Sequence, residues 1–120
     1  MASLTGVRVL VVEDEAMLLL ALQDILEELG CELAACAARL SEATDIARHI
    51  QCEVAILDIN LGGERIDAVA DILANRGIPF VFATGYGDDG VMARHQSAPL
   101  MEKPYDSDDL RKALTSILVR

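Results

Sequence analysis

The sequence predicts an α/β fold in which five parallel strands form one sheet with helices on both faces. Two observations lead to this prediction. Short apolar runs and segments with helical spacing alternate five times along the 120 residues, the pattern of a doubly wound sheet. The runs are nearly continuous in apolar residues, as expected for strands buried on both faces. Because 52% of the residues are hydrophobic, one domain of this size can form a single core.

The first two strand–helix units occupy the first 50 residues. The apolar run 7–12, interrupted only by Arg8, predicts the first strand, and Gly30 ends the helix after it. Residues 31–37 predict a weaker second strand, and Ser41 is expected to cap the short helix that follows. The apolar positions have helical spacing in both helices: Leu18, Leu22, Ile25, Leu26 and Leu29 in the first, and Ala43, Ile46, Ala47 and Ile50 in the second.

The third and fourth strands are predicted at 54–57, which ends directly at Asp58, and at 78–83. Between them we expect a loop at 59–63 and a helix that ends at 75–77. The inward positions of this helix are Ile66, Val69, Ala70 and Leu73.

Residues 86–98 contain acidic and glycine breakers with few periodic apolar positions, so we expect a short, weakly anchored helix there. Residues 99–101 predict the fifth strand. The acidic run 106–109 predicts the start of the final helix, because acidic side chains favour a helix N-terminus.

Polar residues follow four of the predicted strands. Glu13 and Asp14 come after the first strand, and Asp58 comes after the third. Thr84 comes after the fourth strand, and Lys103 comes after the fifth. The carboxyl ends of parallel strands lie along one edge of a sheet, where open α/β folds build their sites. We therefore expect three carboxylates, a hydroxyl and an ammonium group to share one cleft.

This combination suits a divalent cation together with a phosphoryl group. Three carboxylates in one cleft repel each other and lose hydration, which is costly without a cation. Oxygen ligands with positions left for water favour Mg²⁺ or Mn²⁺. A carboxylate beside Mg²⁺ can attack phosphorus and hold the group as an aspartyl phosphate. Each acid on its own could be an ordinary solvated residue at the end of a strand. The four polar segments together favour a metal and phosphoryl site.

Charge and the other reactive side chains argue against several classes of function. Twenty acidic residues against ten basic ones give a formal charge of −10, which argues against binding nucleic acid or anionic membranes. No secretion signal or bilayer-spanning apolar stretch is found in the sequence, so we expect a cytoplasmic protein.

The odd number and the spacing of Cys31, Cys36 and Cys52 favour free thiols over a disulfide or zinc site. We expect His49 and His95 to be surface residues with no catalytic part.

In this order, the polar residues resemble the receiver domain of bacterial two-component response regulators. The resemblance covers essentially the whole chain and rests on four segments: Val-Val-Glu-Asp-Glu at 11–15, Leu-Asp-Ile-Asn-Leu at 57–61, Ala-Thr-Gly at 83–85 and Lys-Pro at 103–104. It implies a flavodoxin-like fold with strand order 2-1-3-4-5 and five helices.

The resemblance also implies the roles of the site residues. Asp58 would be the phosphoacceptor, and a sensor histidine kinase would supply the phosphoryl group. The implied metal site consists of Glu13, Asp14, Asp58 and Asn60. Asp14, Asp58 and the carbonyl of Asn60 would hold Mg²⁺ directly, and Glu13 would act through a metal-bound water. The implied catalytic residues are Asp58, Thr84 and Lys103, of which Thr84 and Lys103 would contact the phosphoryl oxygens.

Two positions depart from the pattern of the family. Leu100 stands three residues before the lysine, where receivers usually carry a Phe or Tyr whose inward rotation reports phosphorylation. Gly62 and Gly63 replace the usual proline after the acceptor, which predicts a looser loop.

The segment Pro-Phe-Val-Phe-Ala-Thr-Gly-Tyr at 79–86 resembles the signature of the receiver subfamily nicknamed FAT GUY. Members of that subfamily lack the aromatic switch and often stand alone. We hypothesise that the signal passes through Thr84 and residues 85–96, and that Tyr86 partly covers the acceptor.

We therefore predict a single receiver domain over residues 1–120, without an output domain, that signals rather than turning over a substrate. It would use Mg²⁺ and then bind a downstream protein, pass phosphate to a histidine phosphotransfer protein, or drain it from a kinase. Both a monomer and a phosphorylation-dependent dimer remain open.

The alternative to a receiver domain is a small Mg²⁺-dependent phosphatase of similar topology. Such enzymes commonly carry an acid two residues after the nucleophile, where this chain has Asn60. A pseudo-receiver that acts only as a binding module usually lacks some of the acids or the lysine.

Overall fold

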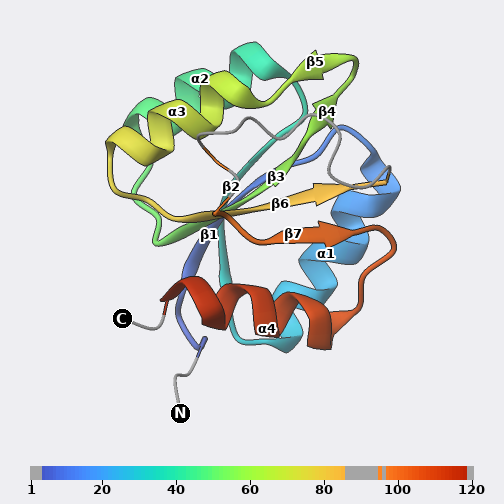
Figure 1. The fold of residues 1–120 in the computed structure, drawn as a ribbon. Coiled ribbons are helices and arrows are strands. Elements are labelled where there is room, and N and C mark those ends of the chain that lie inside the picture. Colours follow the sequence, from blue (N-terminus) through green and yellow to red (C-terminus); the bar gives the residue numbers. More distant parts are fainter. Residues whose placement is uncertain (1–3, 86–94, 96, 119–120) are drawn as a thin grey trace.

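A single parallel sheet forms the centre of the molecule (Figure 1), as seen in a computed structural model that describes residues 4–85, 95 and 97–118. Its five strands lie in the order β2-β1-β3-β6-β7. Their bounds are β1 Arg8–Val12, β2 Glu32–Ala37, β3 Val54–Asp58, β6 Phe80–Thr84 and β7 Leu100–Glu102. Because β6 and β7 are the fourth and fifth strands of this sheet, the predicted order 2-1-3-4-5 is confirmed.

Four helices cover the sheet within the described residues: α1 Ala16–Glu28, α2 Leu40–His49, α3 Asp67–Asn75 and α4 Ser107–Leu118. Helices α2 and α3 lie on one face, and α1 and α4 lie on the other (Figure 1). The additional helix expected at 86–98 falls mainly on residues 86–94 and 96, which lie outside the described residues, as does Tyr86.

The three central strands, β1, β3 and β6, are buried almost throughout, as their continuous apolar runs predict. The edge strands β2 and β7 are partly exposed. Alternate residues face two separate hydrophobic clusters. The cluster under α2 and α3 includes Leu10, Val12, Ala55, Leu57, Phe80 and Phe82. The cluster under α1 and α4 includes Val9, Val11, Val54, Ile56, Val81 and Met101. Every residue of β3 is buried, so the carboxylate at its end, Asp58, is held at the edge of the core.

The helix ends follow local chemistry that is largely visible in the sequence. Gly30 and Gly77 take left-handed φ angles of 83° and 74° directly after the C-caps of α1 and α3. The prediction for Ser41 was wrong, because α2 starts earlier, with Arg39 as N-cap and no side-chain cap. Glu42 Oε1 instead accepts a hydrogen bond of 3.0 Å from the backbone N–H of Ala38.

Residues 60–65 form a short hairpin where the sequence predicted only a loose loop. Strands β4 (Asn60–Leu61) and β5 (Glu64–Arg65) pair in antiparallel fashion. Gly62 and Gly63 form the turn with φ angles of 58° and 88°, the left-handed pair required by a two-residue type I′ hairpin turn. The glycines therefore specify a defined turn rather than looseness.

His95 is buried, which contradicts its predicted place on the surface. It is 7% exposed, and its Nε2 lies 2.7 Å from Asp71 Oδ1 in α3. The ring also makes edge contacts with Phe80 and Phe82, with centroid distances of 5.5 and 6.4 Å. His49, in contrast, is exposed as predicted.

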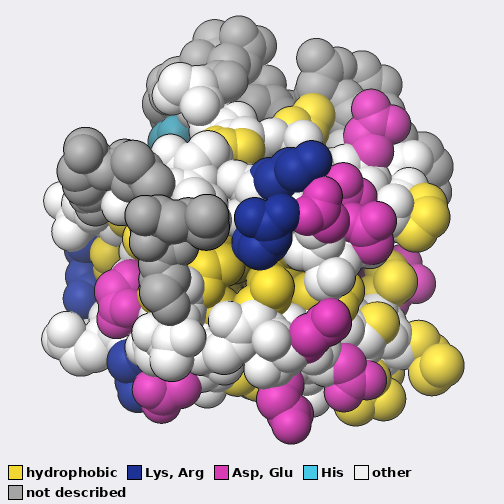
Figure 2. All heavy atoms as spheres, turned by 90° about the horizontal axis from the view of Figure 1, so that it is seen from below, with side chains coloured by type: hydrophobic (Ala, Val, Ile, Leu, Met, Phe, Trp, Pro, Cys, Tyr) yellow, Lys and Arg dark blue, Asp and Glu magenta, His cyan; other side chains and the backbone are white. Residues whose placement is uncertain are grey.

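The surface carries many acidic side chains and the thiols are unpaired. Figure 2 shows one face on which acidic side chains are spread among hydrophobic and basic ones.

Cys31, Cys36 and Cys52 are free, as their spacing predicted. None of the helices in the described part of the chain combines the length and the apolar character needed to cross a bilayer.

Candidate functional site

The strands bring the polar residues to one edge of the sheet. Asp58 and Thr84 are the last residues of β3 and β6, and Lys103 directly follows β7. The register aligns these ends, since Asp58 pairs with Ala83 and Thr84 pairs with Glu102. Asp58 and Lys103, which are 45 positions apart in the sequence, therefore meet at one edge, with Thr84 on the strand between them.

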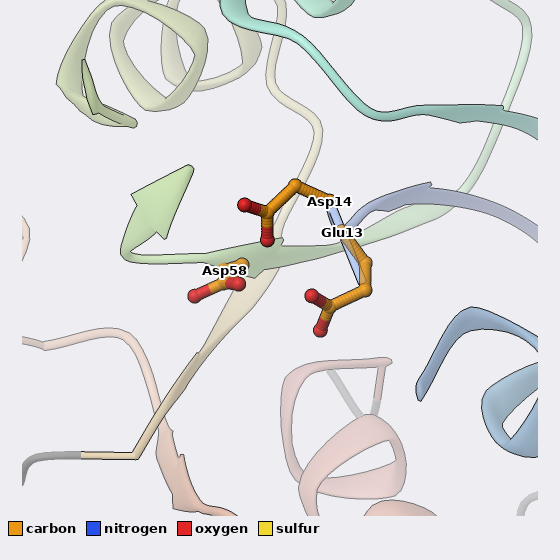
Figure 3. A group of neighbouring side chains, drawn as sticks. All are labelled: Glu13, Asp14 and Asp58. Atoms are coloured by element: carbon orange, nitrogen blue, oxygen red, sulfur yellow. The ribbon is translucent and has the colours of Figure 1, made fainter. Parts of the chain in front are cut away.

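Three carboxylates gather at this edge. Each of Glu13, Asp14 and Asp58 offers an oxygen atom, and these atoms lie within 4.8 Å of one another. Figure 3 shows the three side chains around a common space, although Glu13 and Asp14 are neighbours in the sequence. Glu13 and Asp58 are buried, 3% and 6% exposed, whereas Asp14 is exposed to solvent. Two buried acids side by side are costly unless cations or donors face them.

Lys103 faces both buried acids. Its Nζ donates to Glu13 Oε1 at 2.8 Å and to Asp58 Oδ2 at 3.1 Å. The lysine side chain is only 15% exposed, and the Lys103–Pro104 peptide bond is cis. One ammonium therefore opposes three carboxylates, which leaves the cluster with a net negative charge.

Backbone groups take the other oxygen of each buried acid. The N–H of Asn60 donates to Asp58 Oδ1 at 3.2 Å, and the N–H of Glu15 donates to Glu13 Oε2 at 3.1 Å. Both carboxylates are thus fixed between a backbone donor and Lys103. Asp58 is therefore held in one orientation at the edge of the sheet.

Burial and the neighbouring charged groups together set the acidity of the side chains at this edge. It raises the pKa of Asp58 to about 6; the hydrogen bond from Lys103 opposes this rise, and the charge of Glu13 adds to it. Burial lowers the pKa of Lys103, but the hydrogen bonds to Glu13 and Asp58 outweigh it, and the net shift is upward. Burial, followed by the charge of Glu13, raises the pKa of Tyr105 to about 12. The negative charge of Glu13 thus contributes to an upward shift of the pKa at each of these three groups.

A hollow of about 310 Å³ opens beside these groups. The residues that line it are Asp14, Glu15, Asp58, Asn60, Gly62, Gly63, Thr84, Gly85 and Lys103. Thr84 is buried at 5% exposure. Glu13 is not among the described residues that line this hollow. The described residues that line a larger hollow near Phe80 and His95 include no acid, so chemistry rather than size identifies the site.

The residues present fit a divalent metal ion. Three carboxylates within 4.8 Å of one another provide the hard oxygen ligands that Mg²⁺ and Mn²⁺ prefer. The excess of negative charge and the exposure of Asp14 to solvent agree with a site for a divalent ion. The cysteines and histidines lie elsewhere, so the donor set is one of oxygens.

Comparison with known proteins points to one family. The family model described as "Response regulator receiver domain" matches residues 9–115. The transcriptional regulatory protein PdtaR of Mycobacterium tuberculosis is 31% identical over 111 residues, which are 89% of this chain and 54% of that protein. The phyllosphere-induced regulator PhyR of Methylorubrum extorquens is 30% identical over 114 residues, which are 92% of this chain and 43% of that protein. The chain thus spans about half the length of these curated relatives.

Solved structures give a similar result. The solution structure of SdrG from Sphingomonas melonis Fr1 matches with a TM-score of 0.83 at 41% identity, covering 99% of this chain and all of that one (100%). A second structure, of the BeF3-activated conformation of SdrG, matches with a TM-score of 0.79 at 39% identity over 99% of this chain and 100% of that one.

Proposed function

This chain belongs to the response regulator receiver domain family, and on that basis we propose that it takes a phosphoryl group onto Asp58 with the help of Mg²⁺. The observation that carries the proposal is the position of Asp58. Its carboxylate lies at the end of a buried strand, fixed by Asn60 and Lys103 and next to two further acids. A domain of this family signals through the state of this residue rather than by turning over a substrate.

The reaction is a displacement at phosphorus. An oxygen of Asp58 forms a bond to the phosphorus atom while the bond from phosphorus to the donor breaks, and a histidine donor leaves as the neutral ring after taking a proton. Asp14 and Asp58, with the carbonyl of Asn60, would hold Mg²⁺, and Glu13 would act through a bound water. When bound, the ion neutralises charge on the phosphoryl oxygens.

Thr84 and Lys103 would bind the phosphoryl oxygens. Thr84 ends β6 and is one of the residues that line the pocket beside Asp58. Lys103 already bonds Asp58 Oδ2, and its flexible stem lets the ammonium follow the charge when the carboxylate becomes an acyl phosphate. Together they supply positive charge and a donor where negative charge is added.

A sensor histidine kinase is the proposed donor, in the cytoplasm. Output would pass to a protein partner, either a downstream target or a histidine phosphotransfer protein that takes the phosphoryl group. The named relatives are regulators. The formal charge of −10 disfavours direct contact of this domain with nucleic acid.

We also assign the chain to the FAT GUY type of receiver on its Pro-Phe-Val-Phe-Ala-Thr-Gly-Tyr segment. Leu100 replaces the usual aromatic residue and lies beside Phe82 in the sheet register. The signal would therefore leave the site through Thr84 without rotation of an aromatic side chain. Tyr86 lies outside the described residues, and its covering role stays a hypothesis, tested by the phosphoryl lifetime of Tyr86→Ala.

The experiment that tests the proposal is phosphorylation by a small donor. Wild type, Asp58→Asn and Asp24→Asn are incubated with acetyl phosphate and Mg²⁺, and the gain of one phosphoryl group is followed by intact mass. We expect a hydroxylamine-sensitive label on wild type and on Asp24→Asn, and none on Asp58→Asn. Label that persists in Asp58→Asn would refute the proposal. Steady release of phosphate from added monoesters would instead favour the phosphatase alternative.

A further inference from the structure

A short hairpin forms one wall of the pocket that contains Asp14 and Asp58. Strands β4 and β5 pair in antiparallel fashion and are joined by Gly62 and Gly63. Both glycines line the pocket. The turn therefore limits what can enter the space next to the acids.

The hairpin is fixed to the core on both sides of its turn. Ile59, Leu61 and Ile66 are buried in the cluster under α2 and α3, and the N–H of Ile66 donates to the carbonyl of Ile59 at 3.3 Å. Within the hairpin, Asn60 Oδ1 accepts the N–H of Gly63 at 3.0 Å. These contacts hold the turn at a set position relative to the sheet.

Gly62 is the residue of the turn that lies next to Asp14. Both glycines have left-handed backbones, with φ angles of 58° and 88°. A Cβ atom added at Gly62 would lie 3.7 Å from Asp14 Oδ2, whereas one at Gly63 would meet no atom within 4 Å. The two positions thus share the same type of backbone and differ in what a side chain would cover.

We propose that the missing side chain at Gly62 keeps the outer side of Asp14 open to a hydrated divalent cation. This inference rests on the proposed function, in which Asp14 is a metal ligand. Mg²⁺ sheds water reluctantly and keeps several waters in protein sites, so a ligand oxygen needs free volume beside it as well as charge. A methyl group against Asp14 Oδ2 removes part of that volume and leaves the charge unchanged. Gly62 is thus a positioning residue of the metal pocket.

The test compares Gly62→Ala with Gly63→Ala in the full chain. Both substitutions place a side chain on a left-handed residue, so both strain the turn, and Gly63, with the larger φ of 88°, is the more demanding position. Mn²⁺ is the probe, and its free-ion EPR signal gives the affinity at fixed pH and ionic strength. We expect the affinity of Gly63→Ala for Mn²⁺ to stay within about twofold of that of wild type. Gly62→Ala should bind Mn²⁺ about tenfold more weakly, which is the smallest loss typical of substitutions next to metal ligands.

Equal affinities of the two alanine variants would overturn the role of Gly62 and leave the metal site standing. Asp14→Asn tests the site itself: if it binds Mn²⁺ as well as wild type does, the proposed ligand set fails whatever the glycine variants show. Thermal unfolding verifies that each variant is folded. Should Gly62→Ala not fold, Gly62→Asn and Gly63→Asn replace the pair, because asparagine tolerates the left-handed backbone. The same order of affinities is then expected, and equality again counts against the inference.

Discussion

Lys103 donates to Glu13 and Asp58 at once, so one side chain compensates two buried carboxylates. Removing one partner of a buried ion pair leaves a charge without compensation and typically costs about 3–5 kcal/mol. We expect Lys103→Met to lower the free energy of unfolding at pH 8 by about 3 kcal/mol, measured by urea denaturation without divalent metal.

Two further variants check this explanation. Lys112→Met removes a lysine that is 69% exposed and paired with Asp108 on α4, and exposed pairs contribute about 0–1 kcal/mol. Adding Asp58→Asn to Lys103→Met removes one of the two facing charges and should recover part of the loss. A loss in Lys103→Met as small as that in Lys112→Met would contradict the role of Lys103 as shared counter-charge.

Asp58 makes stability depend on pH in a predictable direction. Its pKa is raised to about 6 by burial, so between pH 4 and 6 the folded protein binds more protons at this site than the unfolded chain. The contribution of Asp58 to stability therefore falls as the pH rises through this window, and the ionised group destabilises the protein above it. We expect Asp58→Asn to be more stable than metal-free wild type at pH 7, by on the order of 2 kcal/mol.

The measurement is a set of urea denaturation curves for both proteins from pH 4 to pH 8. The difference between Asp58→Asn and wild type should grow as the pH rises to about 6 and then level off. A difference that stays constant over the whole range would mean that burial does not raise the pKa of Asp58.

At the scale of elements, His95 and Asp71 join the segment before β7 to helix α3. The Nε2–Oδ1 distance is 2.7 Å, and the histidine ring lies against Phe80 and Phe82. Replacing His95 by Leu keeps apolar volume but removes the hydrogen bond to the carboxylate, which is worth about 1.5–3 kcal/mol when one partner is charged. We expect His95→Leu to lower the free energy of unfolding by about 2 kcal/mol in the same denaturation assay.

The other histidine provides a matched control for this experiment. His49 ends α2 and is exposed, so His49→Leu should change stability by less than about 0.5 kcal/mol. Equal effects of the two substitutions would show that the contact between His95 and Asp71 contributes nothing specific.

The sheet could be predicted from the sequence because each of its strands is a short apolar run and the helices have regular spacing. The meeting of Asp14, Asp58 and Lys103 then follows from the topology, since each stands at the carboxyl end of a strand. The buried place of His95 could not be predicted, because its partner Asp71 lies 24 residues earlier and no local pattern joins them. The hairpin was missed for another reason: two glycines allow both a loose loop and a type I′ turn, and the burial of Leu61 selects the turn.

At the scale of the whole molecule, electrostatic repulsion opposes folding. The formal charge is −10, and acidic side chains are spread over the face that Figure 2 shows. A chain with this excess of one sign is stabilised by any added salt through screening. Stabilisation by Mg²⁺ therefore identifies a site only when it exceeds the effect of a monovalent salt at the same ionic strength.

The last prediction separates specific binding from this screening. A ligand that binds only the folded state stabilises it by RT ln(1 + [L]/Kd), about 1.4 kcal/mol at ten times Kd. We expect Mg²⁺ to raise the free energy of unfolding of wild type above its value in KCl of equal ionic strength. Asp14→Asn should lose this excess because it removes a carboxylate of the cluster. Asp24→Asn, an exposed acid on α1, makes the same change in net charge and should keep it. If both variants respond to Mg²⁺ alike, the ion acts through overall charge, and the cluster of Glu13, Asp14 and Asp58 is not where it binds.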